Sequence, residues 1–405
     1  MDELRNVEYL PEPNDRSIVS AIDPAVVGHQ DGYRSQVTGW APRIAMPMVR
    51  HRRRFPVGNA VALAVLISVG MFLWQSQLLV IQLPLPDSEW AYDATNIREM
   101  QEGGLTGDGI RVCMVDTGLD AEHEAFAGSD IVFHDLVGNS ATPKEYGAIA
   151  HGTLMAGILV ADAHQLGAAP NVTLGMVAAL SDDGMGENTG DESVVGDAIR
   201  WCQFQFQADI ISLSLGGAPS MSMDREGNSA SATRQATDSG IYVIAAAGND
   251  GGVDDDGDVS SPGNVPRAIS VGAVTKDGTV WENSSRGSQT LANGDQRQSP
   301  HLKPEVVAPG HQIISTGQSG TWYSSSGTSD STVFVTGALS LILEANPHLR
   351  ASVQENGNCI DAVKQALADS SQPLLDGKVH DDRWGYGSLD TIAWAEEVGK
   401  ITSCG

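Results

Sequence analysis

A serine, a histidine and an aspartate in this 405-residue chain stand where nucleophilic catalysis would need them. Ser329 lies in Gly-Thr-Ser-Asp at the head of a long apolar segment, and the backbone N–H groups at a helix start favour a developing negative charge. His151 opens a shorter helical stretch as His-Gly-Thr. Asp116 ends an apolar strand as Val-Asp-Thr-Gly. These residue types form a nucleophile, its base and the carboxylate that orients the base.

A fourth residue offers a hydrogen-bond donor. Asn249 follows the small-residue run Ala-Ala-Ala-Gly, as expected of a buried strand that ends in a turn. Its side-chain amide and the backbone N–H of Ser329 would together bind an oxyanion. The alternative for Asn249 is an ordinary turn former, since asparagine is common in tight turns.

These motifs resemble those of subtilisin-like serine proteases, over residues 88–397. The chain order Asp, His, Ser is that of subtilisin. Four further segments resemble family signatures and stand in the family's order: Ile211–Gly217, Asn283–Gly287, Val307–Gly310 and Trp384–Gly387. The resemblance implies a serine endopeptidase that works through an acyl-enzyme on Ser329. His151 would be the general base and Asp116, rather than the nearby Asp120, its orienter.

The same resemblance implies how a polypeptide substrate would bind. Ser214, Leu215 and Gly216 are similar to the edge that pairs with the substrate backbone, and Gly184 lies in a segment similar to the facing edge. An extended peptide between the two edges would add as a strand. Acidic residues crowd the second edge: Asp182, Asp183, Glu187, Asp191 and Glu192. They indicate either a preference for Lys or Arg in the substrate or a solvated acidic loop.

Asp330 departs from the family pattern, which continues with methionine after the serine. Two interpretations stand. An anion in the first turn of a helix suits the helix dipole. Alternatively, the charge stabilises protonated His151 or shapes the leaving-group side of the site.

The sequence argues against two other function classes. A catalytically inactive subtilisin-like binding module is opposed by the complete set of Asp116, His151 and Ser329. An α/β-hydrolase esterase would need Gly-x-Ser-x-Gly and the order Ser, acid, His, and Ser331 stands where the final glycine would be. The chemistry expected of a serine protease requires no cofactor.

An acidic loop is the candidate metal site. Asp254, Asp256 and Asp258 supply carboxylate oxygens of the kind that calcium prefers. The EF-hand pattern fails, because its first ligand position falls on Gly252 and no glutamate closes the loop. A structural calcium ion here is therefore one interpretation and a solvated turn the other.

Composition excludes some partners. The formal charge is −27 at pH 7, and the excess of acid lies beyond residue 86. Such a domain repels nucleic acid and anionic lipid headgroups, so we expect no nucleic-acid partner. The charge is consistent with solubility in a salty medium or with binding of cations or basic substrates.

The N-terminal region predicts a membrane anchor. Residues 1–49 are polar and punctuated by proline, as in a flexible tail. A basic cluster then precedes residues 55–83, which contain no charged side chain and are long enough to span a bilayer. The positive-inside tendency places the N-terminus in the cytoplasm and the peptidase domain, residues 88–405, outside the cell membrane. A cleaved signal peptide is the rival interpretation, but the apolar run starts late and is long for one.

The span leaves little room for a pro-domain before Trp90, so we expect the domain to fold unaided or with outside help.

The four cysteines are too few for a disulfide framework. Cys113 lies in a predicted core strand and Cys202 on a predicted helix, so both are expected to be buried thiols. Cys359 and Cys404 are expected to be able to form a bridge if the domain lies outside the cell.

The apolar pattern predicts an α/β fold with helices on both faces of a parallel sheet. The strand candidates are Ile110–Val115, Val172–Ala179, Ile210–Leu215, Ile241–Ala246 and Ile269–Val274. Helices are expected between them, for instance over Val194–Gln207. Val333–Leu343 is apolar on nearly every side, which indicates a helix buried in the middle of the domain. Gly337 would allow that helix to pack closely.

Overall fold

The structure is a computed structural model, and it describes residues 57–75, 87–217, 227–253, 255–291, 293–373 and 378–404. The chain divides into two units, Met1–Leu83 and Pro84–Gly405. In the first unit, helix α3 spans Val57–Gln75, while the predicted tail and the rest of the predicted anchor lie outside the described residues. Of the helices that the structure describes, none combines the length and apolar character needed to cross a membrane.

The second unit is built on a parallel β-sheet, as the sequence pattern predicts. Among the described residues, seven strands form it in the order β2-β3-β1-β6-β7-β8-β9. Their bounds are β1 Arg111–Asp116, β2 Asp130–Asp135, β3 Thr173–Ala178, β6 Ile210–Leu213, β7 Tyr242–Ala246, β8 Ile269–Val274 and β9 Val306–Pro309. Two antiparallel hairpins accompany the sheet: β4 Ser181–Asp182 with β5 Asn188–Thr189, and β10 His311–Thr316 with β11 Trp322–Ser326.

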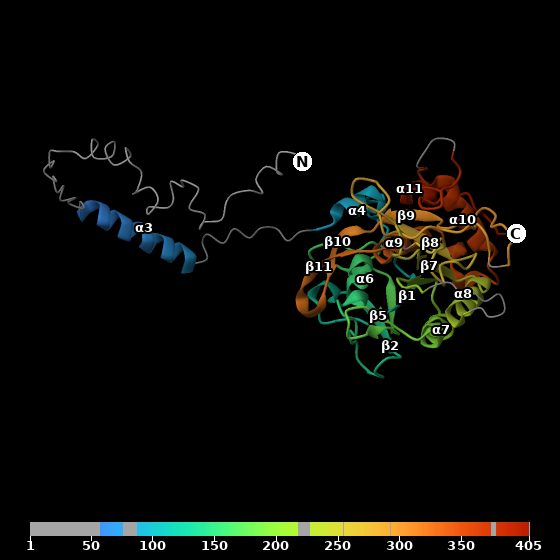
Figure 1. The fold of residues 1–405 in the computed structure, drawn as a ribbon, viewed down its shortest axis with the longest axis horizontal. Helices are drawn as coiled ribbons and strands as arrows, with labels where there is room; N and C mark the ends of the chain where they lie inside the picture. The colour runs from blue at the N-terminus through green and yellow to red at the C-terminus, as the bar shows by residue number, and fades with distance from the viewer. Residues whose placement is uncertain are drawn as a thin grey trace, which may run out of the picture. The chain divides into compact units, whose positions relative to one another are not determined.

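Helices cover both faces of the sheet, and its strands are almost completely buried except for the partly exposed edge strand β2. Their bounds are α4 Glu89–Ala94, α5 Ile97–Glu102, α6 His151–Val160, α7 Glu192–Trp201, α8 Asn228–Asp238, α9 Thr328–Ala345, α10 Asn358–Ser370 and α11 Thr391–Val398. Alternate residues of β1 belong to different cores: Val112 and Met114 pack on the side of α6 and α9, and Cys113 and Val115 on the side of α7 and α8. Figure 1 shows α7 and α8 side by side.

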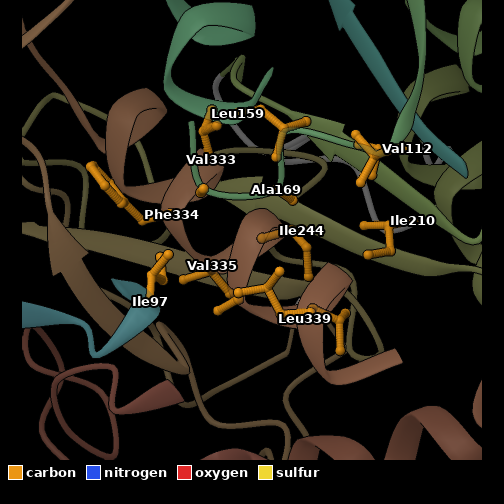
Figure 2. Close-up of a cluster of buried hydrophobic side chains, with 14 of the residues drawn as sticks. Ile97, Val112, Leu159, Ala169, Ile210, Ile244, Val333, Phe334, Val335 and Leu339 are labelled. Carbon is orange, nitrogen blue, oxygen red and sulfur yellow. The ribbon is translucent and has the colours of Figure 1, made fainter. Parts of the chain in front are cut away.

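Helix α9 fills the larger core, as predicted for Val333–Leu343. It packs against β6, β7, β8 and β9, and Figure 2 shows Val333, Val335 and Leu339 in one buried cluster with Ile210 and Ile244. A methyl group on Gly337 would overlap the side chain of Ala168, so glycine is required for this approach. The helix's hydroxyl groups find acceptors both within it and outside it: Thr332 Oγ1 donates to Thr328 O over 2.8 Å, and Ser331 Oγ donates to Ala308 O of β9 over 2.9 Å.

Some predicted elements differ from the structure at their ends. The helix predicted over Val194–Gln207 is α7 followed by a π-helical turn, Cys202–Phe206. Strands β2 and β9 were not predicted. β2 has charged residues at both ends and lies at the edge of the sheet, and β9 contains Pro309, a residue that weakens any strand prediction.

The prediction of two buried thiols is wrong. Cys113 and Cys202 form a disulfide that joins β1 to the end of α7, with Cα atoms 5.7 Å apart. Both residues are buried, but the sheet and helix bring them into bonding distance across 89 residues of sequence. The Cys359–Cys404 bridge, expected for a domain outside the cell, is present as well.

Candidate active site

Asp116 and His151 are joined by a hydrogen bond at the carboxyl end of β1. Asp116 is the last residue of β1 and His151 the first of α6. The His151 Nδ1 atom lies 2.7 Å from Asp116 Oδ1, and only 1% of the Asp116 surface is exposed. A buried carboxylate in this position fixes the imidazole's orientation and stabilises its protonated form.

The turn after β1 positions both residues. Gly118 has a φ of +112°, and a side chain on Gly152 would overlap the Gly118 backbone, so α6 starts directly against this turn. Gly152 N donates to Thr117 Oγ1 over 2.8 Å. The predicted alternative orienter, Asp120, accepts instead from the backbone of Ser319 and Glu122, so it is not a partner of His151.

Charge around His151 favours its protonated form. Burial alone lowers the pKa of His151, but the Asp116 carboxylate, together with those of Asp330 and Glu145, raises it to about 9. Glu145 was not singled out from the sequence. Its carboxylate accepts from the backbone N–H and the hydroxyl of Thr153, so it also holds the first turn of α6 in place.

Ser329 occupies the second position of α9, where Gly327 and Thr328 present it. It is 8% exposed. Its hydroxyl donates to the backbone oxygen of Ser214 over 3.1 Å, and Ser214 Oγ donates back to Ser329 O over 3.1 Å. Within the described part of the chain, the structure records no hydrogen bond between Ser329 Oγ and His151. Unliganded sites often hold such pairs apart, and the contact then forms with substrate.

Asn249 lies beside the start of α9. It follows the end of β7 and is exposed. Its Oδ1 accepts from Thr328 N and Thr328 Oγ1, both over 2.9 Å, which directs the Nδ2 donor toward the space beside Gly327. A Cβ atom on Gly327 would lie 3.5 Å from Asn249 Nδ2 and 3.6 Å from Ser329 N. The two predicted oxyanion donors therefore border one space.

The predicted substrate edges are located on two loops. Ser214, Leu215 and Gly216 follow β6 directly; Leu215 is partly exposed and Gly216 exposed. Gly184 lies at the tip of the β4–β5 hairpin with a φ of +80°, and its N–H donates to Asp182.

The acidic side chains of that hairpin have local partners. Asp183 accepts from Met185 N and Glu187 N, and Asp191 caps the start of α7. Each of these contacts satisfies the backbone of a turn or a helix end, as a solvated acidic loop would.

The candidate calcium loop shows no converging ligand set in the part that the structure describes. Asp254 lies outside the described residues. Asp256 accepts from Asp258 N, and Asp258 accepts from Val259 N and Ser288 N. No group of three histidine, cysteine, aspartate or glutamate side chains is arranged around one point in the described residues. The carboxylates of Asp256 and Asp258 are turn acceptors here, which does not fit a preformed cation site.

Comparison with known proteins agrees with this geometry. Residues 107–387 match the model of the subtilase family, Peptidase S8. The chain is 34% identical to subtilisin DY of Bacillus licheniformis over 64% of this chain and 85% of that protein. It is 31% identical to an intracellular serine protease of Paenibacillus polymyxa over 67% of this chain and 78% of that protein.

A solved structure gives the same result for the fold. A cold adapted subtilisin-like serine proteinase matches 71% of this chain and 90% of its own, with a TM-score of 0.54 and 27% identity. The family model covers more than half of the chain, and the fold matches that of a solved subtilisin-like proteinase. The chain therefore belongs to the subtilase family and is a subtilisin-like serine peptidase.

Proposed function

We propose that Asp116, His151 and Ser329 are the catalytic triad of this peptidase and that Asn249 supplies the side-chain half of its oxyanion hole. The observation that carries this assignment is the 2.7 Å hydrogen bond between His151 and the buried Asp116. The pair lies at the carboxyl end of β1, and Ser329 lies in the first turn of α9. No metal or organic cofactor takes part in the chemistry.

The reaction begins with a rotation of the Ser329 hydroxyl from Ser214 O toward His151 Nε2. His151 accepts the proton as Ser329 Oγ attacks the scissile carbonyl, and Asp116 stabilises the resulting imidazolium. Asn249 Nδ2 and Ser329 N bind the oxyanion. His151 then gives the proton to the leaving amine, and water attacks the acyl-enzyme by the same route in reverse.

The substrate is an extended polypeptide, and the enzyme is an endopeptidase that cleaves within it. Its backbone pairs with Leu215 and Gly216 on one side and with the hairpin tip at Gly184 on the other, as a strand added to an edge. Gly216 and Gly184 are exposed and lack side chains, so a substrate backbone can approach them closely, although the N–H of Gly184 already donates to Asp182.

The test is active-site labelling. The full-length chain in detergent and its Ser329→Ala variant are treated with a fluorophosphonate, and casein hydrolysis is followed in the same samples. Labelling and hydrolysis are expected in the first and absent in the second. A folded wild-type protein with neither would instead favour a binding module.

We further propose that residues 55–83 tether the enzyme to the cell membrane with the peptidase domain outside. The proposal rests on the absence of charge in that segment, on the basic residues before it and on the two disulfides, which persist in oxidising compartments. Full-length protein should remain with membranes after carbonate extraction, and protease added outside intact cells should digest the domain. Recovery in the carbonate supernatant would contradict the tether.

A further inference from the structure

Asp330 is a buried carboxyl group beside the nucleophile. It lies in the first turn of α9 and is 1% exposed. A carboxylate withdrawn from water must be paired or become neutral, because its desolvation is costly. One of its oxygens, Oδ1, accepts a hydrogen bond from Ser325 Oγ on β11.

The other carboxyl oxygen borders the oxyanion space. A Cβ atom on Gly327 would lie 3.6 Å from Asp330 Oδ2, 3.6 Å from Ser329 N and 3.5 Å from Asn249 Nδ2. Two hydrogen-bond donors and a carboxyl oxygen thus surround one point, which is kept open because residue 327 has no side chain. An oxyanion bound by the two donors would face Asp330. An ionised carboxylate there would repel the oxyanion, whereas a protonated one could donate to it.

We propose that Asp330 acts as a neutral carboxylic acid that donates a third hydrogen bond to the oxyanion, and that its ionisation removes this contribution. The inference rests on the proposed roles of Ser329 and Asn249. The proton stays on Asp330 throughout, so the step changes no bond order and needs no further reactant.

The surroundings of Asp330 favour the neutral form. Burial raises the pKa of Asp330 to about 7, against the opposing effects of the Ser325 hydrogen bond and of protonated His151. Among the described residues, the titratable groups that act on it are His151 of α6 and Tyr92 of α4. Asp330 and His151 therefore titrate as a coupled pair. At pH values between the two ionisations, the pair holds one proton. In the productive arrangement this proton is on Asp330, and His151 is neutral.

The pH profile of Asp330→Asn is the first test. In the wild-type protein, kcat/KM is expected to rise and then fall again at alkaline pH as the pair loses its last proton. An asparagine still donates but does not ionise, so the alkaline fall should disappear. Its rising limb should move to lower pH, because one anion near His151 is lost. A profile with an unchanged alkaline fall would overturn the proposal.

Two further variants separate donation from a merely structural role. Asp330→Ala removes the donor and should lower kcat by roughly tenfold to a hundredfold with little change in KM, the range expected for one hydrogen bond to a charged group. Ser325→Ala keeps the carboxyl but removes a contact that lowers its pKa, so the alkaline fall should move to higher pH. If Asp330 served only the helix dipole, the variants would lose stability and leave the alkaline limb in place.

Separate measurements distinguish a failure of this proposal from a failure of the assignment on which it rests. Loss of labelling in Ser329→Ala tests the proposed nucleophile, and thermal unfolding of each variant shows that it is folded. Serine-dependent hydrolysis together with an unaltered alkaline limb in both Asp330→Asn and Ser325→Ala would refute the role of Asp330 alone.

Discussion

Ser214 and Ser329 exchange two hydrogen bonds, each hydroxyl donating to the other's backbone oxygen over 3.1 Å. These two hydrogen bonds connect the end of β6 to the start of α9, so they fix the position of the nucleophile relative to the substrate-edge loop. Only one of the two bonds depends on the Ser214 side chain, which makes its contribution measurable.

Ser214→Ala should therefore lower the free energy of unfolding by about 1 kcal/mol, the usual net value of one hydrogen bond. The Ser329 hydroxyl keeps its acceptor, since that acceptor is backbone, and kcat should change less than tenfold. Urea unfolding and casein hydrolysis measure the two effects. An unchanged free energy of unfolding in Ser214→Ala would show that the hydrogen bond from Ser214 Oγ to Ser329 O contributes nothing to stability.

Asn249→Ala removes one proposed oxyanion donor. The expected loss in kcat is about 10²–10³-fold, a magnitude borrowed from measurements on subtilisin itself. KM should change little, because the donor acts on the transition state. Thr328 also loses the acceptor for its backbone N–H, so the thermal midpoint must be measured as a control. Full activity in a folded variant would refute the assignment.

Asp116→Asn should lower kcat by about 10⁴-fold, the loss known for the equivalent change in another serine protease.

The same substitution should also change the pH dependence of stability. The pKa of His151 is about 9 in the folded protein and 6.5 in the unfolded chain. Stabilisation by the pair is thus complete below pH 6.5 and lost as the pH rises through 9. Thermal midpoints between pH 6 and 10 should fall in the wild type and stay flatter in the variant; parallel curves would contradict this pairing.

Glu305→Gln should destabilise the fold. Glu305 is 1% exposed and receives the side chains of two fully buried lysines, Lys303 at 2.9 Å and Lys364 at 2.6 Å. Removal of its charge leaves two buried ammonium groups without an anion, a loss of about 3–5 kcal/mol. The exposed pair Lys378–Asp381 provides the control, since Lys378→Gln should cost less than about 1 kcal/mol. Equal losses in the two variants would rule out the buried network as a source of stability.

The pKa values around Glu305 give this prediction a pH dependence. Burial raises the pKa of Glu305, but the two ammonium groups more than offset it and lower the pKa below 4.5. The stabilisation is present above pH 4.5 and lost as the pH falls through the lower folded value. Glu305→Gln should remove this part of the acid sensitivity.

Cys404→Ser opens the loop closed by the Cys359–Cys404 disulfide, which spans 45 residues of sequence. The chain-entropy model gives a loss of about 4 kcal/mol in unfolding free energy for a loop of this length. Urea unfolding without reductant measures it. Wild-type protein treated with dithiothreitol should be destabilised further than the variant, because Cys113–Cys202 is then broken too; equal midpoints would show that this second bridge is not reduced.

The amino-acid sequence alone predicts five strands of the sheet, the buried helix and the chemical groups of the site. Five of the sheet strands are continuous apolar runs, and α9 is apolar on nearly every side because it is surrounded by protein. The sequence also places Asp116 at a strand end and Ser329 at a helix start, since these positions follow from where the apolar runs stop.

The contacts between these segments depend on how the chain folds in three dimensions. The Cys113–Cys202 bridge joins two residues whose surroundings look alike to a local pattern, and the pairing depends on which face of β1 meets α7. The environment of Asp330 is also partly non-local, because Ser325 is close in sequence but Asn249 follows β7 and His151 begins α6. A pattern of residues specifies which surface each segment buries, but contacts and pKa values depend on what the fold then places against it.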